Sequence, residues 1–404
     1  MNQAQLRPEA VAATRQAGLS PPLPQIPADI FDPAHYAPVR RSLLEAETLP
    51  AWCYISEAFY RREVEQIFLK VWNFVGRADR IPSPGDYVAF DFVGVPVVLL
   101  RDKQGEVRAF VNTCRHRGTQ IMSGEGNCAA LRCPYHSWTY GLDGRLRGAP
   151  GMEDTVGFDK SDYALQPIRI DSWDGFLFIN FDPDSIGLRE YLGDLPERFA
   201  CYNFADMVCV RRKEYDLACN WKVYVENAME SYHVPTVHGL TLQKQKRDIN
   251  PPIAANGEYC GLYTRHIGSR ALLAGDTGFP YIPTLTGEAT EGTFYPLIFP
   301  STMFALTYDC MWWLEIHPRG PSHMKLIVGS CFPRSTVERG DFDEVLAKYV
   351  RRWDQSIPED NDISERQQLG LASPFTAPGR FSALEPLVHV IDNWVLDRVI
   401  GPAR

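Results

Sequence analysis

Two short segments of the chain each offer one thiolate and one imidazole to a metal. They are the C-x-H pair at 114–116 and the C-x-x-H pair at 133–136, with 16 residues between them. Four such ligands could hold a single zinc ion in a tetrahedral site. They could also hold a [2Fe–2S] cluster with two histidines on one iron and two cysteines on the other, which raises the reduction potential above that of an all-cysteine cluster. The order Cys, His, Cys, His favours the cluster, since each segment then supplies one ligand to each iron.

A second pair of metal ligands lies in the segment NWKVYVENAMESYHVPTVHG, which begins with a helical pattern and contains His233 and His238. On an uninterrupted helix, side chains five residues apart point about 140° away from each other. A metal shared by both histidines therefore requires the backbone to leave the helix between them, and Pro235 gives a reason for that. Two histidines and one carboxylate on one face of an Fe(II) ion leave positions open for dioxygen. The alternative is two ordinary histidines of the core or surface.

The third ligand would be a carboxylate from elsewhere in the chain. The stretch IPEDNDISERQQLGLAS supplies four candidates, Glu359, Asp360, Asp362 and Glu365. Chemistry alone does not choose among them. The alternative interpretation of this stretch is a solvated helix N-terminus, where the helix dipole favours carboxylates.

The two patterns together are similar to a known family. CRHRG followed by CPYHSWTY resembles the signature of Rieske [2Fe–2S] domains, and the downstream pattern resembles the iron site of Rieske non-haem iron oxygenases. The resemblance implies that the cluster ligands are Cys114, His116, Cys133 and His136. It also implies one mononuclear Fe(II) held by His233, His238 and the Asp of an E-D element that precedes a helix with E-x-x-Q. That residue is Asp360, with Asp362 as the reserve.

Glu230 stands three residues before His233, so on a helix the two side chains lie on one face. By itself it could be an ordinary surface carboxylate. In the family that the chain resembles, an acidic residue at this place bonds both an iron histidine and a cluster histidine of the neighbouring subunit, which is the suggested electron route. The resemblance therefore implies a catalytic role for Glu230, contact with His136 of the partner subunit, and a homotrimer, alone or with a small second subunit as α3β3.

The substrate class can also be read from the resemblance. Glu230 in E-x-Y-H is similar to the branch of the family that oxidises quaternary ammonium compounds such as betaines, carnitine and choline. We therefore expect dioxygen-dependent hydroxylation or N-demethylation of a small ammonium compound. Aromatic residues that could offer faces to such a cation are Trp312, Trp313, Tyr308 and Phe304, with Tyr295 nearby in the sequence. The same residues could instead be sheet core, since aromatic side chains are enriched in strands.

Other functions remain as alternatives. The first is hydroxylation or cis-dihydroxylation of an aromatic acid, which would also suit an aromatic pocket. The second is a Rieske electron carrier without oxygenase activity, against which the length of the chain and the second metal pattern both argue. The third is a zinc-stapled binding module, which would be colourless, whereas an iron–sulfur protein is brown.

Composition limits the partners. A net charge of −9 and a pI near 5.6 argue against nucleic acid, which needs clustered basic residues. The chain has no apolar run of about 18 residues and no leader pattern, so we expect no membrane span and, with ten scattered cysteines, a reducing cytoplasmic location. No G-x-G-x-x-G fingerprint is present, so electrons from NAD(P)H would arrive only through a separate reductase or ferredoxin.

The elements expected to position these residues form two domains and an arm. Residues 1–50, rich in Pro and Ala, indicate an arm that packs on the second domain. A helical pattern and then short β-rich runs predict a small all-β Rieske domain over 51–170, although the strand-like GFLFINFDP near residue 180 fits its closing strand. Residues 171–404 mix helical and strand patterns and predict the mononuclear iron catalytic domain. The fold class is α+β, and the resemblance implies a helix-grip (START-like) catalytic domain with an antiparallel sheet.

Overall fold

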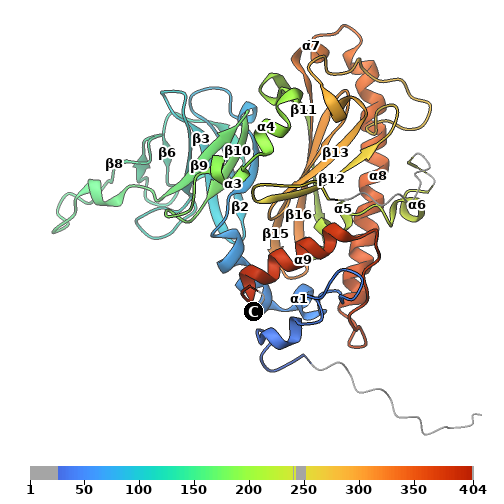
Figure 1. Ribbon diagram of the computed structural model, residues 1–404. Helices are drawn as coiled ribbons and strands as arrows, with labels where there is room; N and C mark the ends of the chain where they lie inside the picture. The colour runs from blue at the N-terminus through green and yellow to red at the C-terminus, as the bar shows by residue number, and fades with distance from the viewer. Residues whose placement is uncertain (1–25, 240, 243–251, 403–404) are drawn as a thin grey trace, which may run out of the picture.

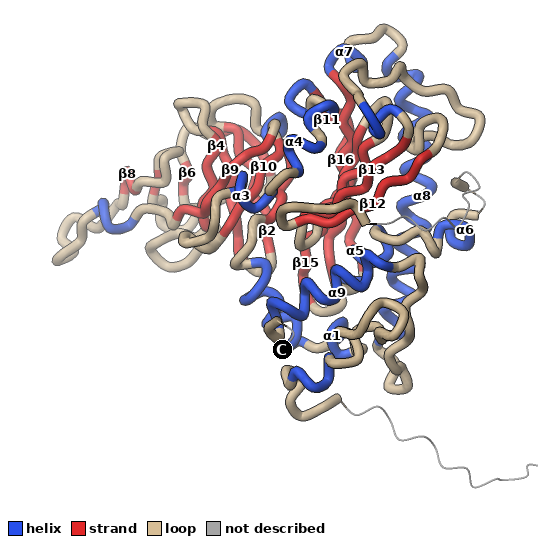
Figure 2. The backbone as a smooth tube through the Cα atoms, viewed as in Figure 1, coloured by secondary structure: helices blue, strands red, loops and turns tan. Residues whose placement is uncertain are grey.

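Two antiparallel sheets form the two halves of the molecule. The computed structural model describes residues 26–239, 241–242 and 252–402 (Figure 1). In Figure 2 the first half consists almost entirely of strands and loops, and the second sheet is flanked by helices. This arrangement confirms the expected α+β class.

The sheet of the first half has seven strands in the order β1-β10-β9-β4-β3-β2-β5. The strands are β1 Asn73–Arg77, β2 Asp86–Phe92, β3 Val95–Arg101, β4 Val107–Val111, β5 Glu125–Asn127, β9 Pro167–Trp173 and β10 Phe176–Asn180. Two-residue turns with positive φ at both residues join β2 to β3 at Val93-Gly94 and β9 to β10 at Asp174-Gly175. Turns of this kind match the right-handed twist of the strands that they connect.

The upper boundary expected for the β domain, at residue 170, falls inside β9. The Asp174-Gly175 turn folds β10 back between β9 and β1, so the sheet continues to Asn180. Cutting the chain at 170 would divide a paired hairpin. The strand-like run near residue 180 is therefore the closing segment of this half.

A smaller sheet forms the tip of the first half, at the left of Figure 1. It contains β6 Leu131–Arg132, β7 Thr139–Tyr140 and β8 Leu146–Gly148. Leu131, Trp138 and Tyr140 are buried there and pack with Phe110 of β4 in a hydrophobic cluster separate from the main core. The tip therefore has a core of its own, which fixes the loops around it.

The second sheet has six strands in the order β11-β16-β15-β14-β13-β12. These are β11 Met207–Leu217, β12 Tyr259–Arg265, β13 Gly292–Ile298, β14 Thr302–Leu306, β15 Met311–Gly320 and β16 His323–Pro333. The helices of the molecule are α1 Trp52–Ile55, α2 Glu57–Glu63, α3 Leu188–Leu192, α4 Leu195–Arg198, α5 Trp221–Ala228, α6 Val234–Val237, α7 Arg334–Val337, α8 Phe342–Leu371 and α9 Pro386–Val399.

Both faces of the second sheet are covered. On one face Trp312 of β15 contacts Trp353 of α8, with ring centroids 6.0 Å apart. On the other face Trp313 contacts Phe74 and Phe176 of the first half, at 5.6 and 6.1 Å. Successive side chains of a strand point to opposite faces, which is why adjacent tryptophans enter different environments.

The described part of the N-terminal arm, 26–50, packs against the second half. Arg40 donates to Asp397 of α9 at 2.5 Å, and Ala46 is buried with Phe381 and Val388. Residues 1–25 of the expected arm lie outside the described residues. The helices α1 and α2, expected in the β domain, also contact α8 and α9, so that domain begins near β1. Among the helices of the described residues, none has the length and apolarity needed to cross a membrane.

Candidate active site

The two segments that carry cysteine and histidine fold into turns of the same form. The N–H of Gly118 donates to the carbonyl of Cys114 at 2.9 Å, and the N–H of Ser137 donates to the carbonyl of Cys133 at 3.1 Å. The donor residue of each turn has a positive φ, 73° and 60°. Glycine adopts this conformation readily, whereas at Ser137 it is uncommon and must be held by the surrounding structure.

These turns bring the four expected cluster ligands to the tip of the molecule. The imidazole rings of His116 and His136 lie 4.6 Å apart and are half-buried, while Cys114 and Cys133 are buried. Trp138 stacks on the His116 ring at 4.9 Å and holds its orientation. The thiols therefore lie inside the tip, and the imidazoles lie towards its surface.

Tyr140 provides a hydrogen bond to this group. Its hydroxyl accepts from the backbone N–H of Arg115 at 3.0 Å and lies 3.4 Å from Sγ of Cys114. Because the hydroxyl accepts from Arg115, its own proton is free to point at the sulfur. Such a bond stabilises negative charge on a thiolate ligand.

The residues present fit a two-iron cluster better than a single zinc ion. Nδ1 of His136 is buried and has no hydrogen-bond partner among the described residues, as expected of a ligand atom. A tetrahedral zinc ion needs ligand atoms about 3.5 Å apart. Among the described residues, the cysteines and histidines of the tip do not form a group of three or more possible ligand atoms within 4.8 Å of one another. A different group does. A [2Fe–2S] cluster spreads its four ligands over two irons.

That other group consists of His233, His238 and Asp360, whose ligand atoms all lie within 4.8 Å of one another. Asp360 Oδ1 is 2.9 Å from Nε2 of His238 and 3.5 Å from Nε2 of His233. The same oxygen is buried and makes no hydrogen bond of normal geometry among the described residues. Three ligand atoms that approach a common point without bonding to one another fit a mononuclear ion with two histidines and one carboxylate.

The histidines flank a single turn of helix rather than lying on a long one. Helix α5 begins at an N-cap, where the Asn220 side chain accepts from the N–H of Lys222, and ends at Ala228. The separate helix α6 then begins at Val234 with Pro235 in its first turn, a position where proline is well tolerated. The backbone therefore leaves the helix before His233, not between the two histidines as we expected. Because α6 is one turn long, His233 and His238 lie at its two ends and can share one ion.

Asp360 lies in the interior of α8, two residues after Pro358. We expected this acidic stretch before or at the start of a helix, and the structure places it eighteen residues into one. Asp362, the reserve, points away from the histidines and forms an exposed ion pair with Arg366 at 3.0 Å. Glu365 accepts from the N–H of Ala218 at 2.9 Å. The position of each residue around the helix axis therefore decides that Asp360, and not Asp362 or Glu365, faces the histidines.

A carboxylate orients each histidine from behind. Oε1 of Glu230 lies 2.6 Å from Nδ1 of His233, and Oε2 of Glu359 lies 2.6 Å from Nδ1 of His238. Each Nδ1 therefore donates to a carboxylate, which leaves Nε2 as the atom that faces Asp360. This arrangement fixes the ring orientation and increases the basicity of the ligand. Glu359 was among the candidate third ligands, and the sequence did not indicate its orienting role.

The same carboxylates give the site an affinity for positive charge. Burial lowers the pKa of His233, but Asp360 and Glu230 more than offset this and raise it to about 9. Burial raises the pKa of Asp360, and the two histidines lower it below its ordinary value. Without a metal the site therefore holds protons, and a divalent cation would displace them.

A cavity of about 120 Å³ opens beside the three ligands. Its other lining residues include Tyr224, Tyr295, Met303, Trp312, Leu314 and Arg352. Trp312, one of the expected pocket residues, therefore lines this cavity. The buried cation in this cavity, Arg352, was missed. Arg352 lies eight residues before Asp360 on α8, a spacing that can be read from the sequence.

The other three expected pocket residues lie elsewhere. Trp313 and Phe304 face the first half, where Phe304 contacts Phe176 at 4.8 Å. Tyr308 stacks on Tyr281 at 4.6 Å beside a different surface hollow. The alternation of the strands explains the error for Trp313 and Phe304, because β14 and β15 present them to the face opposite the metal ligands.

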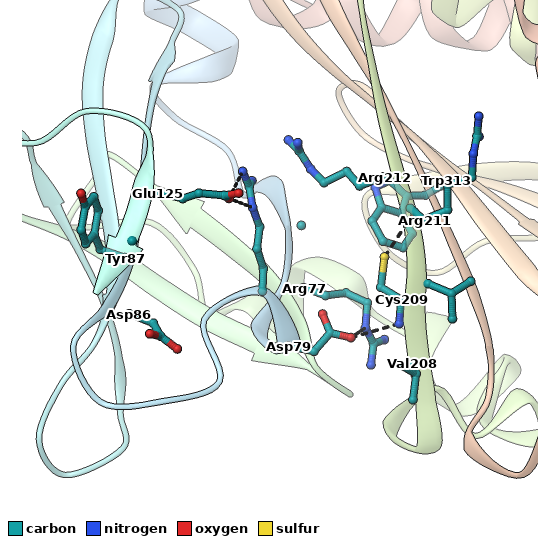
Figure 3. Close-up of a pocket in the computed structure, with 14 residues that line it drawn as sticks. Arg77, Asp79, Asp86, Tyr87, Glu125, Val208, Cys209, Arg211, Arg212 and Trp313 are labelled. Atoms are coloured by element: carbon teal, nitrogen blue, oxygen red, sulfur yellow. Dashed lines mark hydrogen bonds and ion pairs between the residues drawn. The ribbon is translucent and has the colours of Figure 1, made fainter. Parts of the chain in front are cut away.

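A larger cavity of about 660 Å³ lies between the two halves (Figure 3). Arg77 donates to Asp79, and Arg80 forms an ion pair with Glu125, both within the first half. Asp79 also accepts from the N–H of Cys209, and this bond joins the first half to β11. Cavity size therefore does not locate the reactive centre, which lies where ligand atoms converge.

Comparison with known proteins also divides the chain into two regions. Residues 71–165 match the family described as Rieske [2Fe–2S] domain, and residues 204–401 match the ring hydroxylating alpha subunit (catalytic domain). The chain is 28% identical over 359 residues to chloroplastic choline monooxygenase of Spinacia oleracea, covering 87% of this chain and 78% of that protein. It is 36% identical over 197 residues to the carnitine monooxygenase oxygenase subunit of Escherichia coli (strain K12), covering 48% of this chain and 53% of the relative.

A solved structure gives the same result in three dimensions. The quaternary ammonium Rieske monooxygenase in complex with γ-butyrobetaine superposes with a TM-score of 0.71 at 26% identity, over 87% of this chain and 95% of that one. The chain therefore belongs to the Rieske non-haem iron oxygenases, whose cofactors are one [2Fe–2S] cluster and one mononuclear iron. Within that family its relatives are the choline and carnitine monooxygenases, which confirms the branch indicated by the sequence.

The residues of the site can be assigned to steps of this chemistry. His233, His238 and Asp360 would hold the iron, which would supply dioxygen activation, and the cluster held at the tip would supply single electrons. Glu230 and Glu359 hold the two imidazoles in place, and the tyrosines and Trp312 enclose the space where a substrate would lie.

Proposed function

We propose that the chain is the oxygenase component of a multicomponent enzyme that hydroxylates or N-demethylates a small quaternary ammonium compound. Dioxygen is the oxidant, and electrons come from NAD(P)H through a separate reductase or ferredoxin. The observation that carries this proposal is the group of His233, His238 and Asp360 beside an aromatic-lined cavity. Two histidines and one carboxylate leave positions open for dioxygen.

The lining of the cavity supports an ammonium substrate. Tyr224, Tyr295 and Trp312 offer aromatic faces, which attract cations through the ring quadrupole. Choline and carnitine monooxygenases are named for ammonium compounds, and the superposed relative was solved with γ-butyrobetaine. Residues such as these bind a methylated ammonium group without a hydrogen bond, which it cannot donate.

We propose further that electrons pass between copies of the chain in a homotrimer, alone or as α3β3. The small sheet that carries the cluster residues and α6 beside the iron residues lie at opposite ends of one chain (Figure 1). Glu230 bonds His233, and the ring of His136 is half-buried at the tip of the first half. Glu230 would join His233 to His136 of the partner subunit.

The second candidate function is oxidation of an aromatic acid. It is favoured by Arg352 in the same cavity, since a guanidinium binds carboxylates of either class. The two candidates differ in the products that they form, so one experiment separates them.

The test is a single turnover of the chemically reduced protein with ¹⁸O₂ and a panel of compounds. The panel contains carnitine, γ-butyrobetaine, glycine betaine, choline, benzoate and salicylate, and products are identified by mass spectrometry. We expect ¹⁸O in a product of an ammonium compound, or formaldehyde released from an N-methyl group. A labelled phenol or cis-diol from an aromatic acid, with the ammonium compounds untouched, would overturn the proposal.

A further inference from the structure

Arg352 is a buried cation inside the cavity that holds the metal ligands. Its side chain lies on α8, and the residue is 9% exposed. The guanidinium stands over the ring of Trp312, 5.1 Å from its centroid. Charged residues are seldom buried to this degree unless they are paired.

The guanidinium is under-used by the protein. Within the described part of the chain, one of its five N–H donors makes a hydrogen bond, from Nη1 to Oγ of Ser356 at 2.9 Å. Its Nε is buried without a partner among the described residues, and no carboxylate of the described part lies within 4 Å of it. Burial lowers the pKa of the Arg352 guanidinium, and the opposing charge of Asp360 does not offset this loss of water.

A purely structural role does not account for this arrangement. Arg351, the next residue, is exposed and forms two hydrogen bonds with Asp276, both of 2.7 Å. Among the described residues, the arginine that faces solvent therefore has carboxylate partners, whereas the arginine that faces the cavity has none. Asp360 lines the same cavity and its charge acts on Arg352, and a bound metal would neutralise that charge.

We infer that Arg352 is the anchor for a carboxylate on the substrate, so that the substrate is a zwitterion or an acid and not a simple cation such as choline. This inference rests on the proposed function, because it concerns the ligand of the same cavity. A planar guanidinium binds a carboxylate through two parallel hydrogen bonds, which would use the donors left open on Arg352.

The charges along the cavity also orient the substrate. Arg352 and Asp360 are separated by eight residues of α8, which corresponds to about 12 Å along the helix axis. The end at Asp360 carries the carboxylates that surround the histidines, and the end at Arg352 carries a cation that forms no ion pair with the described residues. A carboxylate held at Arg352 would direct the methylated ammonium end of a small zwitterion towards the metal ligands.

The anchor also explains why Trp312 is not available on both faces. One face of its ring is already covered by the guanidinium, so an ammonium group would avoid that side. Tyr224 and Tyr295 are then the aromatic residues left for the ammonium group. Trp312 acts as a positioning residue, because it holds the plane of the guanidinium.

The test compares ligands that differ only in the carboxylate. Binding of γ-butyrobetaine and of its methyl ester to the cluster-loaded protein is measured by calorimetry without dioxygen, so that no turnover occurs. The proteins are wild type, Arg352→Gln, Arg352→Lys and the matched control Arg351→Gln. We expect wild type to prefer the acid about 10- to 100-fold, the range of a charged hydrogen-bonded pair. Arg352→Gln should remove that preference, Arg352→Lys should restore part of it, and Arg351→Gln should keep it.

Each result decides the inference. Equal loss of acid and ester binding in Arg352→Gln would mean that the arginine only supports packing, and equal binding of both ligands by wild type would overturn the anchor even if the variants fail to fold. Benzoate, an acid without an ammonium group, is titrated in parallel. If it binds in an Arg352-dependent manner and no ammonium compound binds, the anchor stands and the proposed function fails. If neither acid binds to wild type, the anchor is wrong.

Discussion

Glu359 should hold His238 in the orientation that the metal requires, and its replacement tests how far this contact matters. The carboxylate lies 2.6 Å from Nδ1 of His238 and accepts a second hydrogen bond from Thr241 Oγ1 at 2.7 Å. Partners of this kind contribute about 10- to 100-fold to metal affinity. Because the Glu359 side chain is 27% exposed, we expect the lower part of that range, about 10- to 30-fold for Glu359→Gln. Glu359→Ala should weaken binding further, since it also removes the hydrogen-bond acceptor.

The assay is an anaerobic Fe(II) titration against a competing chelator, after the mononuclear site has been emptied. The visible absorbance of the cluster is recorded on the same samples and should not change. Asp362→Asn is the matched control, because Asp362 lies one turn away on α8 and pairs with Arg366 at the surface. If both Glu359 variants bind Fe(II) within twofold of wild type, the carboxylate does not orient the ligand and the reasoning is refuted.

Three further predictions concern the cluster, a buried acid and the sheet. Tyr140→Phe should lower the reduction potential of the cluster by roughly 20–60 mV, the equivalent of one lost hydrogen bond to Cys114. Burial raises the pKa of Glu226 to about 7, so folding stability should fall as the pH rises from about 4.5 to about 7, and Glu226→Gln should remove part of that fall. Gly329→Ala should destabilise the protein by about 1–3 kcal/mol, because a Cβ there would collide with the Trp313 ring.

Each of these has a direct measurement. Redox titration of the Tyr140→Phe cluster contradicts the hydrogen bond if the potential is unchanged or rises. Denaturant unfolding at pH 5 and pH 8 decides the second prediction. Between these pH values the folded protein keeps the proton on Glu226, whereas the unfolded chain has lost it. The free energy of unfolding of Glu226→Gln, relative to that of wild type, must therefore be higher at pH 8 than at pH 5. Unfolding of Gly329→Ala with a midpoint equal to that of wild type would mean that Trp313 can move aside.

The cluster and the iron histidines could be predicted because each pair lies within a few residues of sequence. In the structure, Cys114 and His116 lie in one turn and Cys133 and His136 in another of the same form. Local spacing determines such turns, so the sequence carries the information. A break in the helix near Pro235 was expected for the same reason. In the structure the break comes before His233, because the separate helix α6 begins at Val234.

The sequence could not show which side of a strand or helix is covered by the rest of the molecule. Trp312 and Trp313 differ only in the side of β15 from which they project, and the assignment of those sides depends on α8 and on the first half of the molecule. The role of Glu359 depends on the phase of a helix whose start lies far upstream. The boundary expected at 170 falls inside β9, because β10 pairs with β9 and with β1, about 100 residues earlier in the chain; that pairing could not be read from the sequence, although the Asp174-Gly175 turn was visible there.

The central claim is that the cluster residues and the group of His233, His238 and Asp360 serve one reaction. It is tested most directly by a single turnover in which cluster oxidation and product are measured on the same sample, for wild type and for Asp360→Asn. Wild type should form product from a carboxylate-bearing ammonium compound as its cluster is oxidised. Asp360→Asn should keep the absorbance of the reduced and oxidised cluster and form no product. Product at the wild-type yield from Asp360→Asn would mean that the three ligand residues do not serve the reaction.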